Sequence, residues 1–206
     1  GKKGFRLDSR LPITLPILNR IIEASAHFAG SRYQICQFKA MCSLAFFAFL
    51  RIGEITVTTS NNQPLQLHQL SQLYDTNNQV KGRKLTFEYS KHNYNQRPFS
   101  LEIYRQTSIC PVQLLIYYLV LRGSQPGAIF ISHLGNPVSR DAFATQLKRA
   151  FRHCGLDTSK YKSHSFRIGA ASHAAEHGYS DAQIRALGRW KSNAILKYLR
   201  FSSLST

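Results

Sequence analysis

The stretch SHSFRIGAASHAAEHGYSDAQIRALGRWKSNAILKYLR, residues 163–200, decides the fold. Its first part, residues 163–177, contains a single glycine and no proline, and predicts a helix. His164 and Arg167 stand three residues apart on this helix, so their side chains share one face. The segment is therefore expected to present a histidine and an arginine to the same ligand.

The rest of this stretch predicts two further short helices. A capping box begins the first, over residues 180–188, and Ser192 is the expected N-cap of the second, over residues 192–200. Trp190 lies at the junction between them, and Tyr198 lies in the last helix. A tryptophan and a tyrosine thus follow the histidine and the arginine closely along the chain.

The sequence upstream predicts four more helices and a small antiparallel sheet. Thr14 as N-cap with Pro16 in the first turn marks a helix start, and the polar stretch 56–82 predicts loops with one short strand. The fold class is therefore α+β, mainly α-helical, with a sheet of about three strands. The expected helices span residues 14–28, 32–50, 111–122 and 139–153, and the expected hairpin strands span residues 85–90 and 98–103.

Two of these elements carry candidate functional side chains. The helix over residues 32–50 becomes almost wholly apolar toward its end, which predicts a central place in the core. Arg51 and Glu54 are expected at its C-terminal end, one turn apart. Lys91 lies in the connection between the hairpin strands, which is longer than a tight turn.

The charge of the chain calls for a polyanionic partner. Lysines and arginines number 27 against 10 aspartates and glutamates, a formal net charge of +17. These residues are scattered singly and in pairs, which suits duplex DNA, whereas anionic membranes usually bind polybasic runs or basic amphipathic helices. The longest apolar runs are far shorter than the roughly 20 residues of a membrane span.

Two expected absences complete the partner predictions. The cysteines at positions 36, 42, 110 and 154 show no metal-ligand spacing, so we expect free thiols and neither a metal nor another cofactor. No secretory signal is visible, so we expect an intracellular protein without a membrane partner, nuclear if its source is eukaryotic.

Two arginines and a histidine are suited to holding a reacting phosphodiester. Attack on the phosphorus builds negative charge on the two non-bridging oxygens, and without a metal ion fixed donors must hold that charge. Arg51 and Arg167 are the candidates, because a guanidinium is planar, always charged and able to bind phosphate through two parallel hydrogen bonds. His164 is the candidate for exchanging a proton or donating to an oxygen.

The remaining candidates supply the bond-breaking chemistry. Tyr198 is the candidate nucleophile, and neighbouring cations or a base would have to activate it, since the usual pKa of tyrosine is about 10. Lys91 is the candidate general acid for the leaving 5′-hydroxyl. Trp190 offers one indole N–H to a further oxygen while its ring packs against the core.

Each of these residues also has a structural interpretation. An arginine beside a glutamate at a helix end is usually an ion pair, and a tryptophan or tyrosine on a helix usually packs beneath a neighbour. Lys91 competes with Lys81 and Lys84, which are equally basic. Their joint occurrence in one order along the chain favours the chemical interpretation.

In that order, the chain resembles the catalytic domain of a tyrosine recombinase of the phage integrase family, from about Thr14 to Arg200. In the family, an arginine followed by xxE ends a buried helix, a lysine lies in the sheet hairpin, and an HxxR helix, a His-or-Trp position and the tyrosine follow. The matching positions are Arg51 with Glu54, Lys91, His164, Arg167, Trp190 and Tyr198.

The resemblance implies a 3′-phosphotyrosine intermediate, strand exchange between two duplexes without metal or ATP, and a homo-tetramer on DNA. Family members usually carry a separate N-terminal helical domain, so residues 1–13 are expected to be a basic linker or a remnant of that domain, and residues 14–206 the catalytic domain. They also commonly extend beyond the tyrosine, so this domain alone is expected to be monomeric. The phrases RLPIT and GRWKS resemble recombinases of eukaryotic mobile elements.

The helix over residues 139–153 is the expected DNA-facing element. Basic residues follow one edge of it and apolar residues another, and residues at its N-terminus are placed to reach a major groove. Basic residues outside this helix are expected to contact phosphates. The predicted DNA contacts are Ser139, Arg140, Lys148 and Arg149 on the helix, and Arg32, Lys39, Lys160 and Lys162 elsewhere.

Two other functions stay open from the sequence. A type IB topoisomerase resembles this family in its active-site chemistry but relaxes supercoils as a monomer. A domesticated protein would keep the fold and bind duplex DNA without cutting it.

Overall fold

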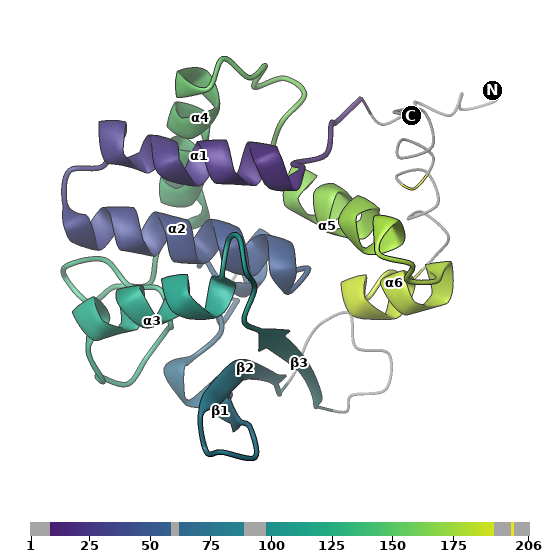
Figure 1. Cartoon of the computed structure of the whole chain (residues 1–206). Coiled ribbons are helices and arrows are strands. Elements are labelled where there is room, and N and C mark those ends of the chain that lie inside the picture. The colour runs from purple at the N-terminus through teal and green to yellow at the C-terminus, as the bar shows by residue number, and fades with distance from the viewer. Residues whose placement is uncertain (1–8, 59–61, 89–97, 192–198, 200–206) are drawn as a thin grey trace.

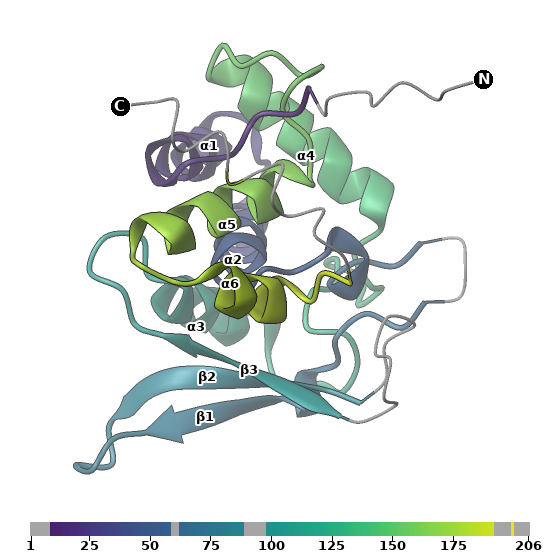
Figure 2. The same cartoon turned by 90° about the vertical axis from the view of Figure 1, so that its right-hand side faces the viewer.

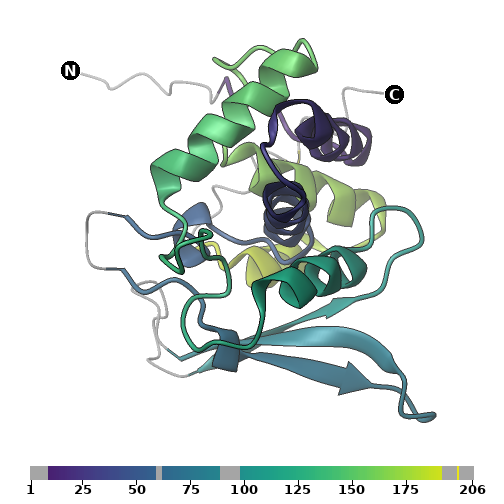
Figure 3. The ribbon, with the colours of Figure 1, turned by 90° about the vertical axis from the view of Figure 1, so that its left-hand side faces the viewer.

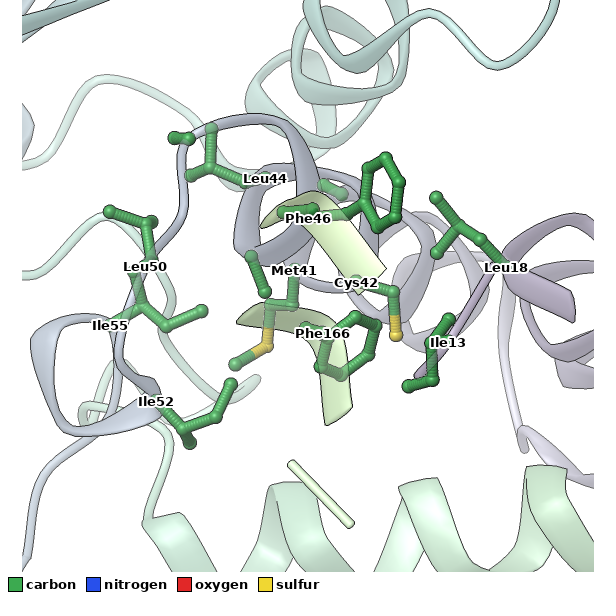
Figure 4. Packing of buried hydrophobic residues seen from close by; sticks show 14 of the residues in the cluster. Ile13, Leu18, Met41, Cys42, Leu44, Phe46, Leu50, Ile52, Ile55 and Phe166 are labelled. Atoms are coloured by element: carbon green, nitrogen blue, oxygen red, sulfur yellow. The ribbon is translucent and has the colours of Figure 1, made fainter. Parts of the chain in front are cut away.

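The centre of the fold is helix α2 (Arg32–Phe47), which packs against α1 (Leu15–Phe28), α3 (Pro111–Arg122) and α5 (Ser165–Glu176). The structure is a computed structural model, and it describes residues 9–58, 62–88, 98–191 and 199. The second half of α2 is buried on all sides because its sequence is almost wholly apolar. Figure 4 shows its side chains meeting residues of the N-terminal segment and of α5.

The helices lie on one side of a three-stranded antiparallel sheet (Figure 1). Helix α4 (Arg140–His153) packs against α1 on the side away from the sheet, and α6 (Asp181–Gly188) lies between α5 and the sheet (Figure 2). Helix α3 lies directly over the sheet and contacts its third strand (Figure 3). This arrangement confirms the expected α+β class, mainly helical with a small sheet.

The sheet has the order β1 (Leu70–Tyr74), β2 (Val80–Phe87) and β3 (Phe99–Tyr104). In the central strand, Leu85 is paired with a leucine of each neighbour and is fully buried. Strand β3 begins one residue later than predicted. Strand β2 begins five residues earlier than predicted, because its polar first half still hydrogen-bonds to both neighbouring strands.

Helix α2 ends before the predicted residue 50, and this corrects the setting of the first catalytic candidate. Phe49 has a φ of 51°, and the Leu50 N–H closes back on the Ala45 carbonyl at 3.1 Å. Arg51 therefore does not leave the buried helix directly. It is the N-cap of a separate 3₁₀ helix, η1 (Ile52–Glu54).

The end of the expected linker packs on the domain. The Leu11 N–H donates to the Lys160 carbonyl at 2.9 Å, and Ile13 is fully buried beside α5. Gly169 of α5 permits this approach, since a Cβ there would overlap the Ile13 carbonyl. Residues 9–13 are thereby fixed against the segment that leads into α5.

The remaining helices agree with the sequence within two residues. The predicted capping box of α6 is present, and Ser139 caps α4 by accepting from the Ala142 N–H at 3.0 Å. Helix α5 begins at Ser165, so His164 is its N-cap and not a residue of its first turn. The helix predicted over residues 192–200 lies outside the described residues except for position 199. A further 3₁₀ turn, η2 (Leu67–Gln69), precedes β1.

Candidate phosphodiester-binding site

A pocket of about 570 Å³ opens where η1, the start of α5 and the end of α6 meet. Arg51 lines it from η1, His164 and Arg167 from the start of α5, and Trp190 from the turn after α6. Four of the six predicted catalytic residues therefore converge on one cavity. The other two, Lys91 and Tyr198, lie outside the described residues.

Arg167 is held rigidly in the wall of the pocket. Its side chain is almost wholly buried, with 3% of the residue exposed. Nη1 donates to the Phe49 carbonyl at 2.9 Å, and Nη2 donates to the Gly188 carbonyl at 2.7 Å. These bonds fix the plane of the guanidinium before any ligand arrives, which is the preorganisation that electrostatic catalysis requires.

Trp190 covers the same guanidinium. The Arg167 Cζ lies 4.2 Å from the centre of the indole ring, within the range of a cation–π contact. The ring also meets Phe49 edge to face, with centroids 6.3 Å apart. The tryptophan thus packs against the core as predicted and also lines the pocket.

Arg51 is placed with hydrogen-bonding capacity to spare. Its Nη2 donates to the Arg189 carbonyl at 3.0 Å, while its buried Nη1 has no hydrogen-bond partner among the described residues. Nη1 lies 3.8 Å from Glu54 Oε1, which is an ion pair but not a hydrogen bond. Burial lowers the pKa of Arg51, the Glu54 charge opposes this shift, and the Arg189 charge adds to it.

Glu54 mainly holds Arg189, a residue that the sequence does not mark as functional. Its carboxylate accepts both terminal nitrogens of Arg189, with Nη2 at 2.8 Å, and it accepts the Arg51 backbone N–H at 2.8 Å. Arg189 also lies over the rings of Phe87 and Phe99, with its Cζ 5.1 and 5.0 Å from their centres. Nothing local marks Arg189, because its carboxylate partner is 135 residues away.

Three more basic residues line this pocket. Arg140 comes from the start of α4, and Lys162 from the segment before α5; both were predicted DNA contacts. Arg10 comes from the N-terminal segment that pairs beside Lys160. From the sequence, Arg10 is assigned only to a basic linker, because no pattern reveals that this segment folds back on the domain.

The other predicted DNA contacts are not among the residues that line the pocket. Ser139 uses its hydroxyl to cap α4, as described above. Lys39 of α2 forms an ion pair with Glu23 of α1, with Nζ and Oε1 2.9 Å apart. The remaining four are exposed side chains whose role stays a prediction: Arg32, Lys148, Arg149 and Lys160.

The described part of the chain contains no cluster of metal ligands and no membrane-spanning helix. Across residues 9–58, 62–88, 98–191 and 199, no three histidine, cysteine or acidic side chains are grouped to hold a metal. All four cysteines are free thiols, and burial raises the pKa of Cys42. None of the helices within those residues has the length and apolarity needed to cross a bilayer.

Comparison with known proteins points to one family. A model described as "Phage integrase family" matches residues 17–200. The chain is similar to XerH site-specific recombinase bound to a palindromic difH substrate, with a TM-score of 0.73 and 13% identity over 98% of this chain and 52% of that one. No curated protein sequence matches.

Two lambda integrase structures are also similar. A dimer bound to a COC′ core site has a TM-score of 0.61 and 17% identity, covering 92% of this chain and 48% of that one. A tetramer bound to a Holliday junction has a TM-score of 0.58 and 18% identity, covering 90% and 48%. The chain thus spans about half the length of these structures' chains, and at such identities the likeness concerns the fold.

Proposed function

Since the chain belongs to the phage integrase family and has the fold of a tyrosine recombinase catalytic domain, we propose that it is a site-specific DNA recombinase or transposase. It breaks and rejoins DNA through a 3′-phosphotyrosine intermediate. One observation carries the proposal: Arg51, His164, Arg167 and Trp190 come from three separate parts of the chain and line one pocket. A scattered set would have favoured their structural interpretations.

The proposed reaction uses two groups outside the described residues. The Tyr198 hydroxyl loses its proton to a base, for which His164 is the candidate, and its oxygen bonds to phosphorus. The bond from phosphorus to the 5′-oxygen breaks, and Lys91 protonates that oxygen. Rejoining reverses these steps with a 5′-hydroxyl as nucleophile, so the bond is conserved without ATP.

The arginine pair supplies the charge stabilisation that the reaction needs. Both guanidinium groups are partly or fully removed from water, where an anion is held more strongly than at the surface. Arg167 already has its plane fixed by two carbonyls, and Arg51 Nη1 has no hydrogen-bond partner among the described residues. In this proposal no metal ion takes part, because guanidinium groups do the work of one.

The proposed partner is double-stranded DNA. Arg10, Arg140 and Lys162 surround the pocket with charge suited to the phosphates beside the scissile one. The lambda integrase tetramer on a Holliday junction supports a homo-tetramer for the full-length protein, and the domain alone is proposed to be monomeric. Its place of action would be inside the cell, where DNA is exchanged, and the nucleus if the source is eukaryotic.

A covalent trapping assay tests the proposal. The protein is incubated with nicked duplex DNA of its cognate site, from which the short cleaved strand diffuses away. We expect a protein–DNA adduct that survives denaturation in wild type and is lost in Tyr198→Phe, because only the hydroxyl oxygen of the side chain is removed. Electrophoresis under denaturing conditions measures the adduct.

Two outcomes would replace the proposal. An adduct that persists in Tyr198→Phe would show that another residue is the nucleophile. Duplex binding without any adduct, with full-length protein and its proper site, would support the non-cleaving alternative. Supercoil relaxation by a monomer without strand exchange would instead support the topoisomerase alternative.

A further inference from the structure

Two arginines compete for the single carboxylate of Glu54. Arg189 holds both carboxylate oxygens through its two terminal nitrogens, the strongest geometry for such a pair. Arg51 is much closer to Glu54 along the chain than Arg189 is, but its Nη1 lies 3.8 Å from the same carboxylate. The three side chains are mostly buried, with 13% of Arg189, 15% of Glu54 and 29% of Arg51 exposed. Their charges are therefore only weakly screened.

The state of Glu54 decides whether Arg51 is free for a ligand. An unoccupied carboxylate 3.8 Å away needs only a small rotation to form a hydrogen-bonded ion pair with Arg51. Such a pair would neutralise the guanidinium and use Nη1, the donor that now has no hydrogen-bond partner among the residues the structure describes. A bound phosphodiester would then have to compete with an internal anion.

We infer that Arg189 is a positioning residue that occupies Glu54 and thereby keeps Arg51 available for the scissile phosphate. The inference rests on the proposed function for the identity of that phosphate, although its charge argument holds for any phosphate-like anion. Arg189 itself is not among the described residues that line the pocket. Its effect on the reaction would pass through Glu54 and Arg51.

The surroundings of Arg189 suit this role because they hold it away from the pocket. The residue has a left-handed backbone, with φ 56° and ψ 42°, at the end of α6. Two aromatic rings lie beneath its guanidinium, and its Nη2 also donates to the Phe49 carbonyl at 3.3 Å. Its own carbonyl accepts Arg51 Nη2, so the same residue orients one nitrogen of Arg51 and spares the other.

Substitutions at both partners test the inference. Arg189→Gln releases Glu54, and we expect the single-turnover rate of adduct formation to fall at least about tenfold, while duplex affinity changes less than about threefold. Adding Glu54→Gln removes the competing charge and keeps an acceptor for the Arg51 backbone N–H. The double variant is expected to recover most of the lost rate, which a merely structural role for Arg189 does not predict.

Two further variants serve as controls for this comparison. Arg189→Lys keeps a cation against Glu54 without the paired geometry, so it should lose less activity than Arg189→Gln, and it replaces that variant if the glutamine protein does not fold. Arg105→Gln removes an exposed arginine at the end of β3 and should leave the rate within about twofold. Circular dichroism and thermal unfolding verify that each protein is folded.

A second readout separates this inference from the proposed function. Binding of inorganic phosphate, measured by its effect on the unfolding temperature, should weaken in Arg189→Gln and recover when Glu54→Gln is added. If wild type forms no adduct but phosphate binding follows this pattern, the inference stands and the proposed function fails. If wild type forms the adduct and Arg189→Gln cleaves at the wild-type rate, or Glu54→Gln gives no recovery, the inference is wrong.

Discussion

Arg167 and Arg51 differ in how much of their hydrogen bonding the protein itself uses. Arg167 gives one nitrogen each to the Phe49 and Gly188 carbonyls, and a tryptophan ring covers its face. Arg51 keeps one buried nitrogen, Nη1, without a hydrogen-bond partner among the described residues. An unmet buried donor costs stability, so an anion that binds there relieves a cost the folded protein already carries.

A substitution at Gly188 tests how tightly Trp190 packs over Arg167. A Cβ at Gly188 would overlap the six-membered ring of Trp190, and that ring covers Arg167. We expect Gly188→Ala to lower the free energy of unfolding by about 1–3 kcal/mol, the usual cost of overpacking, because the indole must move. Urea unfolding measures the change, and adduct formation should slow as the tryptophan leaves the guanidinium.

Gly53 supplies the matched control. It lies on the wall of the same pocket, and a Cβ there would have nothing within 4 Å. Gly53→Ala should leave stability within about 0.5 kcal/mol, as for other substitutions that meet no neighbour. Equal losses in the two variants would mean that the indole contact is not what limits the size of residue 188.

At the scale of elements, the sequence predicts what local patterns can encode. The apolar run in α2 and the capping box of α6 follow from neighbouring residues, and both elements are present. The predicted end of α2, at residue 50, was wrong because the chain turns at Phe49. Phenylalanine rarely adopts a positive φ. The hydrophobic pattern alone gives no warning of that turn.

The residues of the site likewise divide into those that local motifs predict and those that they do not. Arg51, His164 and Arg167 were recognisable because each stands in a short motif with a chemical reason. Arg189 and Arg10 were not, since their roles depend on contacts made across the fold. Long-range contacts of this kind leave no periodic trace in a single sequence.

The surroundings of His173 on helix α5 lead us to expect that stability depends on pH. His173 packs between Phe46 and His177, and burial, followed by the His177 charge, lowers its pKa below the ordinary 6.5, with Glu176 opposing the shift. Near pH 6 the unfolded chain binds more protons at this site than the folded one. The free energy of unfolding should therefore rise with pH through this range. It should level off above about pH 6.5, where the histidine is neutral in both the folded and the unfolded chain.

Comparison with His173→Gln isolates this contribution. Urea unfolding of both proteins between about pH 5 and 7.5 should show a steeper rise with pH in wild type, because the glutamine does not titrate. Parallel curves would mean that His173 binds protons equally in the folded and unfolded states.

At the scale of the whole molecule, separate segments bring their charge to one place. Arg10 precedes α1, Arg140 begins α4 and Lys162 precedes α5, and all three line the pocket with the arginine pair. The chain as a whole carries +17. In the proposed function this surface binds DNA by releasing counterions from phosphates, which makes its affinity depend on salt.

The salt dependence of duplex binding therefore measures this surface directly. If about five phosphates are neutralised, affinity should fall roughly five-hundredfold between about 50 and 200 mM salt. The double variant Arg140→Gln/Lys162→Gln should make the slope of log affinity against log salt shallower by about 1.8, since each lost contact removes about 0.9. Fluorescence anisotropy with a labelled duplex measures both slopes.

A second double variant separates local contacts from net charge. Arg20→Gln/Arg105→Gln also removes two positive charges, but neither arginine is among the residues that line the pocket: Arg20 donates to the Cys154 carbonyl and Arg105 to the Val80 carbonyl. Its slope should stay close to that of wild type, because counterion release follows the phosphates in contact with the protein. Equal changes of slope in the two double variants would show that only total charge matters. If the affinity of wild type did not change with salt, this surface would not be the one that binds DNA.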